Sequence, residues 1–315
     1  MGREITNMYL DTNDRIIDQF PEYNGEITLH SPDNSYVRLI AHYKNGNADG
    51  TFQWFGPNKQ LTCTGSYLND ERTGPWKWYS LSGKLIHEVN YVNGERDGLE
   101  VYYTENGTKS SDLIWVKGVS EGAFHYYHDN GKMSLSGNYF NDERHGKVTT
   151  YNANGEVMMI RFYNQGVIES YAYLGTDGKE IAPIPLDSKE MVITCYYKNG
   201  KKSTEHQRKN GLIEGKFTEY YENGKISEEN TYVHDEGNGK FFQYSENGTI
   251  TEEVDYVKGV KHGWEITYFA TGKIKSKTPY LYGDKHGTAI TYSADGKMIQ
   301  KTIYYNDNAL SIEKL

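Results

Sequence analysis

Aromatic residues and glycines recur along the chain at a fixed spacing of 24 residues. One glycine series is Gly50, Gly74, Gly98, Gly122 and Gly146, and after a break the step returns in Gly215, Gly239, Gly263 and Gly287. An aromatic series keeps the same step in Tyr67, Tyr91, Trp115, Tyr139 and Tyr163. Self-similarity at such a period is typical of repeat architectures, in which each unit packs only on its neighbours. The chain is therefore predicted to be an array of repeated units.

Each unit has the pattern of a β-hairpin. Short runs such as Lys240 to Tyr244 alternate in polarity, and an Asn-Gly pair such as Asn106-Gly107 follows. Alternation predicts strands, and Asn-Gly between two such runs is the strongest short hairpin signal. No segment has a convincing helical period. We therefore predict an all-β fold, an elongated single twisted antiparallel sheet of about twelve stacked 24-residue hairpins.

The phase of the repeat also predicts the organisation of the chain. A first array covers residues 26–169 and a second covers 191–310, with an N-terminal cap segment at 1–25 and a tail at 311–315. The 21 residues between the arrays, 170–190, are a degenerate repeat. Pro183 and Pro185 lack the backbone N–H that a central strand needs, so a bend is expected there.

These positions resemble the MORN-variant repeat. Tyr256, Gly259, Gly263, Tyr268 and Gly272 have its spacing, and the resemblance covers roughly 43–163 and 196–304. Bacterial chains of this kind are often described as YwqK-type antitoxins. The resemblance implies a repeat scaffold, antitoxin-like by occlusion of a toxin, and it supplies no catalytic motif.

Composition narrows the class of protein. Only 36% of the residues are hydrophobic, yet the chain holds 29 Tyr, which favours a thin, Tyr-rich β structure over a large core. The net charge of −9 disfavours nucleic acid and anionic lipid as partners. No apolar run is long enough to insert in a membrane. The N-terminus does not resemble a signal peptide, which favours the cytoplasm; removal of a signal would place the protein in the periplasm or at the surface.

Candidate chemistry is sparse. The catalytic signatures that were sought, such as Gly-x-Ser-x-Gly and His-Glu-x-x-His, do not occur, so no enzyme and no cofactor are predicted. His145, His262 and His286 occupy equivalent turns, and about 9–10 Å between neighbouring units is too far for one metal ion. No metal site is predicted. Cys63 and Cys195 are interpreted as small residues that pack within strands.

The two arrays differ on one face of the first strand of each unit. Positions two and four after the repeat glycine share that face. In the second array Phe217 and Phe241 are the aromatics there. The interpretations left open are a packed face and an exposed aromatic platform for a partner. The first array carries seven aromatics in eight such slots: Phe52, Trp54, Trp76, Trp78, Tyr102, Phe124 and Tyr126.

Charge follows the aromatics. Residues 191–315 contain 17 basic and 17 acidic residues, so residues 1–190 carry the whole excess of −9. The candidate binding surface therefore combines the seven aromatics with acidic turn residues, and it suits another protein with a basic surface. The alternatives are a carbohydrate or cell-surface binding module on Trp54, Trp76 and Trp78, and a structural component of a larger assembly. Exposed sheet edges could also pair copies edge to edge. The acidic candidates are Glu71, Glu95, Asp97, Glu121 and Glu143.

Overall fold

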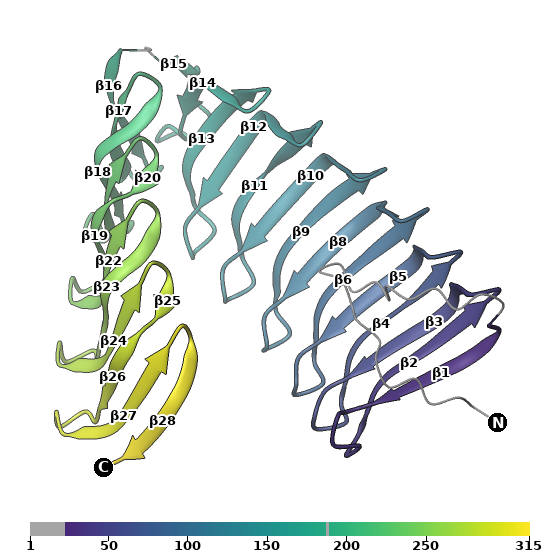
Figure 1. The fold of residues 1–315 in the computed structure, drawn as a ribbon. Coiled ribbons are helices and arrows are strands. Elements are labelled where there is room, and N and C mark those ends of the chain that lie inside the picture. Colours follow the sequence, from purple (N-terminus) through teal and green to yellow (C-terminus); the bar gives the residue numbers. More distant parts are fainter. Residues whose placement is uncertain (1–22, 187–188) are drawn as a thin grey trace. The chain divides into compact units, whose positions relative to one another are not determined.

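The computed structural model describes residues 23–186 and 189–315 (Figure 1). The predicted N-terminal cap at 1–25 lies almost wholly outside the described residues. The described chain is all-β, as predicted, and its strands are antiparallel hairpins. The sequence predicts one sheet, whereas the described strands form two, of 15 and 13 strands. Within the described part of the chain, no helix is long and apolar enough to cross a membrane.

The first sheet consists of β1 (Gly25–His30), β2 (Val37–Lys44), β3 (Asn47–Phe55), β4 (Leu61–Leu68), β5 (Glu71–Tyr79), β6 (Leu85–Val92), β7 (Glu95–Arg96), β8 (Gly98–Tyr103), β9 (Lys109–Val116), β10 (Val119–Tyr127), β11 (Met133–Phe140), β12 (Glu143–Tyr151), β13 (Val157–Asn164), β14 (Val167–Ala172) and β15 (Ile184–Pro185). The second consists of β16 (Glu190–Tyr196), β17 (Lys202–Lys209), β18 (Leu212–Tyr220), β19 (Ile226–Val233), β20 (Glu236–Gly237), β21 (Gly239–Tyr244), β22 (Ile250–Val257), β23 (Val260–Tyr268), β24 (Ile274–Leu281), β25 (Asp284–Lys285), β26 (Gly287–Tyr292), β27 (Met298–Tyr305) and β28 (Asn308–Lys314). The strands follow one another in chain order in both sheets, except that the two-residue strands β7, β20 and β25 pair only with the strand before them, so that β6 pairs also with β8, β19 with β21 and β24 with β26.

Two kinds of turn alternate along each sheet. At Asn93-Gly94 both residues have positive φ, 50° and 78°, as a two-residue type I′ turn requires. At the turn that contains Asn106-Gly107 only the glycine has positive φ, and the Thr104 N–H bonds the Thr108 carbonyl at 2.8 Å. This is the longer loop with a bulge. Asn-Gly therefore marks a hairpin at 106–107, as predicted, but its turn is not the two-residue form.

The sheet break falls in the degenerate repeat. β14 pairs with β15 through only two residue pairs, Ser170 with Pro185 and Tyr171 with Ile184. Proline at 185 supplies no N–H, so the ladder cannot continue along this strand. The first sheet ends there, and β16 begins the second.

The chain divides into two compact units. One contains the chain to Val148 with 153–155 and 163–167, and the other contains 149–152, 156–162 and 168–315. The predicted array boundaries at 169 and 191 stay a prediction. Each unit has its own apolar cluster. The first cluster is built on Phe52, Tyr67, Trp76 and Val89, and the second on Met159, Tyr171, Ile193 and Cys195.

Candidate functional site

The candidate aromatics of the first sheet occupy two parallel rows on one face. The row two residues after each repeat glycine is the core row: Phe52, Trp76, Glu100 and Phe124. All four are buried, with Trp76 and Phe124 at 0% exposure. Of the two interpretations left open, the packed face therefore holds for Phe52, Trp76 and Phe124, and these three candidates are not part of an exposed platform.

Glycines explain why the core row is so deeply buried. A Cβ added to Gly65 on β4 would lie 2.2 Å from the Trp76 ring, and one added to Gly137 on β11 would lie 2.9 Å from the Phe124 ring. The neighbouring strand is thus reduced to backbone where each large ring lies. Because the rings pack onto that backbone, they lose their access to solvent.

The second row, four residues after each repeat glycine, is more accessible. We call it the aromatic row, and it contains Trp54, Trp78, Tyr102 and Tyr126. His87 on β6 also belongs to the row and lies between Trp78 and Tyr102. Trp54 and Trp78 are half-buried, whereas Tyr102 and Tyr126 are 39% and 40% exposed. Trp78 stacks on His87 at 4.4 Å between ring centroids, and His87 stacks on Tyr102 at 4.1 Å. The strands thus present ring edges, not ring faces, along this part of the row.

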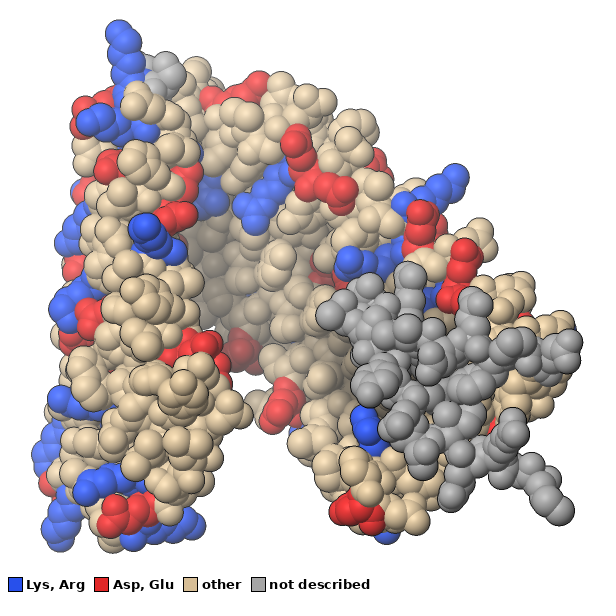
Figure 2. Space-filling model, in the orientation of Figure 1, with Lys and Arg blue, Asp and Glu red and all other residues tan. Residues whose placement is uncertain are grey.

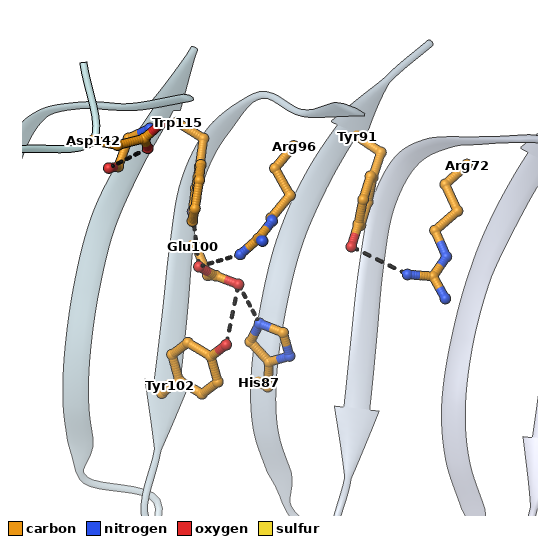
Figure 3. Close-up of polar contacts among 9 residues, drawn as sticks. Arg72, His87, Tyr91, Arg96, Glu100, Tyr102, Trp115 and Asp142 are labelled. Carbon is orange, nitrogen blue, oxygen red and sulfur yellow. Dashed lines mark hydrogen bonds and ion pairs between the residues drawn. The ribbon is translucent and has the colours of Figure 1, made fainter. Parts of the chain in front are cut away.

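Glu100 is the one carboxylate in the core row, and its oxygens are fully engaged (Figure 3). Trp115 Nε1 donates to it at 2.7 Å, His87 Nε2 lies 2.8 Å away and Tyr102 donates at 3.2 Å. Arg96 completes the set at 3.5 Å. Burial alone raises the pKa of Glu100, but the hydrogen bonds and the charge of Arg96 outweigh it, so the pKa lies below its usual value.

A similar cluster lies on the opposite face. Asp112 on β9 is buried and receives hydrogen bonds from Tyr127 at 2.8 Å and Lys109 at 3.1 Å, with His125 Nδ1 at 2.6 Å. Burial raises the pKa of Asp112, and these partners more than reverse that effect, so its pKa is also lowered. Both carboxylates have structural partners on several sides.

The acidic candidates lie away from the aromatic row. Glu71 begins β5, whereas Trp78 lies near the other end of that strand, so the acidic turn residue and the aromatic row are separated by most of the strand. Glu71, Glu95 and Glu143 are exposed. Asp97 and Glu121 instead accept backbone N–H groups from Lys117 at 3.2 Å and Asn141 at 2.9 Å, so they hold neighbouring turns.

Sequence reasoning missed a repeated pairing of a cation with an aromatic ring. A basic residue two positions before the repeat glycine lies over the aromatic ring of the residue seventeen positions after that glycine. Arg96 lies 3.8 Å from the centroid of the Trp115 ring, and Arg72 lies 5.4 Å from that of Tyr91. The signal was readable, because the same two positions recur in three further units. These are Arg144 with Tyr163, Lys261 with Tyr280 and Lys285 with Tyr304.

In the second sheet the row equivalent to the aromatic row is acidic. Glu219 pairs with Glu228, Glu228 with Gln243, and Gln243 with Glu252 across the strands. Burial and the charge of Glu228 raise the pKa of Glu219 to about 7. Burial and neighbouring carboxylates also raise the pKa values of Glu228 and Glu252. Figure 2 shows basic and acidic side chains interspersed on the visible surface of this sheet.

Histidine and cysteine do not gather into a site in the described residues. No group of three or more His, Cys, Asp or Glu side chains there could hold a metal ion. His262 and His286 contact Tyr282 and Tyr305 instead. Neither cysteine forms a disulfide, and burial raises the pKa of Cys195 to about 12, which keeps it a neutral packing residue.

Comparison with known proteins identifies the repeat. No curated protein matches the chain. A chain of the solved structure titled "Crystal Structure of TcdB2-TccC3-TEV" aligns with 93% of this chain at 10% identity and a TM-score of 0.18. The alignment spans 18% of that chain, and so low a score carries no argument. Six segments match the MORN repeat variant: 72–93, 144–165, 213–234, 238–258, 261–282 and 285–307. The chain therefore carries MORN-variant repeats, which supports a MORN-repeat protein.

Proposed function

We propose that the chain is a non-enzymatic repeat scaffold that binds another protein with a basic surface through the first array. The observation that carries this proposal is the aromatic row, which ends in Tyr102 and Tyr126 at 39% and 40% exposure. Tyrosine is a favoured interface anchor because it buries a large area at a low entropic cost. The second array has Glu219 and Gln243 at equivalent positions, so the row is a property of the first array.

Charge supports a basic partner. The first 190 residues carry the whole net charge of −9, and Glu71, Glu95 and Glu143 are exposed at equivalent turns between strands of the first sheet. Two of these glutamates pair with an exposed apolar residue on the neighbouring strand, Glu71 with Leu68 and Glu95 with Val92. Complementary charge speeds association and fixes the orientation of the partner.

The alternatives receive less support. A sugar would stack on ring faces, but both faces of His87 and one face each of Trp78 and Tyr102 are covered by this stack, and Trp76 is buried. A structural role in a larger assembly has no feature that favours it over partner binding. The narrower hypothesis of an antitoxin-like protein that occludes a toxin depends on the sequence resemblance alone.

The test uses the full chain as bait in source lysate. A triple charge reversal, Glu71→Lys with Glu95→Lys and Glu143→Lys, should reduce the on-rate of a captured partner, and salt should reduce the wild-type on-rate. The control reverses Glu236 and Asp284, which hold equivalent positions in the second array. Tyr126→Ala should weaken binding by about 2 kcal/mol. Equal capture by all variants would reject the proposed surface.

A further inference from the structure

A pairing between a tyrosine and a carboxylate recurs in both sheets and is interrupted at Lys277. The Tyr127 hydroxyl donates to Asp112, fifteen residues earlier, at 2.8 Å. Twenty-four residues after Tyr268 the chain has Tyr292, and the residue fifteen positions before Tyr292 is Lys277. Three further pairs keep the spacing of fifteen residues at 2.7–3.2 Å, and they are Tyr103 with Glu88, Tyr244 with Glu229 and Tyr268 with Glu253.

A lysine completes the surroundings of each of these four carboxylates. In the Asp112 cluster the Lys109 Nζ lies 3.1 Å from the carboxylate. The position is therefore one at which a tyrosine hydroxyl and an ammonium together hold a carboxylate by hydrogen bonds, at least one of them charge-assisted. The four ion pairs are Lys77 with Glu88, Lys109 with Asp112, Lys216 with Glu229 and Lys240 with Glu253.

Lys277 occupies the position of the carboxylate in the same register. It pairs with Ile290 across β24 and β26, and Tyr292 follows two residues later. Glu253 has the same relation to Ile266 on the next strand. Among the described residues, no hydrogen bond or ion pair engages the Tyr292 hydroxyl or the Lys277 ammonium. Two donors are therefore present here without the acceptor that they have in the other four clusters.

The acidic side chains on the two strands before β24 do not fill this position. Glu253 and Asp255 on β22 both pair with Lys240, Asp255 at 3.0 Å. Glu265 on β23 pairs with Lys261. These carboxylates have cations of their own, so they are not available to Lys277.

An exposed tryptophan lies on the same face as Lys277. Trp264 pairs with Pro279 across β23 and β24, and Ile266, two residues after Trp264, pairs with Lys277. Alternate residues of a strand share a face, so Trp264 and Lys277 lie on one side of the sheet. Trp264 is 43% exposed, whereas the other four tryptophans of the chain are buried or half-buried. An exposed tryptophan is a favoured interface anchor.

We propose that Trp264, Lys277 and Tyr292 form a binding site for an acidic segment of a partner protein. An Asp or Glu side chain of that segment accepts hydrogen bonds from the Tyr292 hydroxyl and the Lys277 ammonium, as Glu253 does from its own tyrosine and lysine. An apolar neighbour in the segment packs on the Trp264 ring. This inference goes beyond the proposed function, because the site lies in the second array and recognises the opposite charge.

The experiment titrates the full chain with acetyl-Leu-Glu-Leu-amide and follows the indole N–H resonance of Trp264 and the ring resonances of Tyr292 by NMR. We expect saturable shifts, with a Kd about five-fold lower than for acetyl-Leu-Gln-Leu-amide, because a charged acceptor makes the stronger hydrogen bonds. Lys277→Glu supplies the missing carboxylate from within the chain and should abolish the shifts. Lys277→Met keeps the apolar stem and should remove the preference for the glutamate peptide.

Two further variants separate the hydroxyl from the overall charge. Tyr292→Phe removes one donor and should raise the Kd of the glutamate peptide about three-fold. Lys301→Glu is the matched control, because it makes the same charge change at the equivalent position of the next unit. Solvent screens charges at that separation, so this control should change Kd by less than about two-fold.

Three results would overturn the site: equal affinity for the glutamate and glutamine peptides, shifts that survive in Lys277→Glu, or no saturable shift with the glutamate peptide. Tighter binding of acetyl-Leu-phosphoserine-Leu-amide would overturn the choice of a carboxylate. The proposed function is tested separately. The triple charge reversal at Glu71, Glu95 and Glu143 alters only the first array and should leave binding of the glutamate peptide unchanged.

Discussion

Buried rings in the first sheet depend on the absence of side chains beside them. Trp76 is fully buried because Gly65 leaves only backbone beneath it, and its Nε1 donates to the Ser66 carbonyl at 3.2 Å. Arg72 also covers the ring, at 4.4 Å from its centroid. The residue therefore contributes packing, one hydrogen bond and a cation–π contact.

Replacement of Trp76 by Ala should cost about 3–5 kcal/mol of folding stability, since it opens a cavity between three strands. Urea denaturation followed by circular dichroism measures this cost. Tyr126→Ala is the comparison, because its ring is 40% exposed and should cost less than half as much. Similar losses for the two variants would contradict the assignment of Trp76 to the core and Tyr126 to the surface.

Glu100 makes the stability of the first sheet depend on pH. Its folded pKa lies below the ordinary value near 4.5, so its contribution is complete above that value and is lost as pH falls through the folded pKa. Glu100→Gln should therefore destabilise the protein by about 1–3 kcal/mol at pH 7, with a smaller difference at pH 3. Denaturation midpoints at the two pH values test this. A difference that stays constant would show that the charge has no part.

At the scale of strands, the sequence predicts where the hairpins lie but not how deeply each side chain is buried. Alternation around residues such as Tyr103 and the glycine step locate the hairpins, because both patterns are local. The same alternation places Trp76 and Trp78 on one face and cannot separate a buried ring from a half-buried one. That difference depends on Gly65 across the sheet. Likewise, Glu100 looks like an exception until His87 and Trp115 are placed beside it by the register.

The acidic row of the second sheet should behave in the opposite sense to Glu100. Glu219 has a raised pKa of about 7, so its contribution to stability is greatest below about pH 4.5 and fades as pH rises through 7. Glu228, directly opposite, repels its charged form, and Arg161 compensates only in part. Glu219→Gln should raise the urea midpoint at pH 8.5 and leave it unchanged at pH 5. Glu236→Gln, in an exposed turn, is the control and should shift neither value.

Across the whole molecule, neighbouring turns are tied together by repeated hydrogen bonds. Asn199 Nδ2 donates to the Glu222 carbonyl at 2.9 Å, and Asn223 Nδ2 donates to that of Glu246 at 2.9 Å. Lys201 and Lys225 add bonds to the same successive turns, at 2.9 and 2.8 Å. Each unit therefore contacts the next in the same way, which makes stability approximately a sum over neighbours.

Deletion of one complete unit should consequently be tolerated better than deletion of half a unit. Removal of 239–262 joins Asn238 to Gly263, which is equivalent to Gly239. The strands that follow can therefore pair with β19 in the register that the deleted unit had. Removal of 251–262 leaves a strand without its partner. We expect cooperative thermal unfolding in the first variant and its loss in the second, as measured by calorimetry. If both deletions abolish folding, stacking between neighbours does not explain the stability.

The short sequence range of these contacts also bears on synthesis. A ribosome adds about 5–20 residues per second, so a 24-residue unit emerges over roughly one to five seconds, whereas a hairpin closes in about 1–10 μs. Each new hairpin can thus add to a folded edge while translation continues. One exception is segment 156–162, where the Met158 carbonyl accepts a hydrogen bond from Ser203 and Glu156 pairs with Lys198. The partners of these groups are synthesised some forty residues later. A pause in translation near residue 190 would therefore leave Met158 and Glu156 of the nascent chain without these contacts.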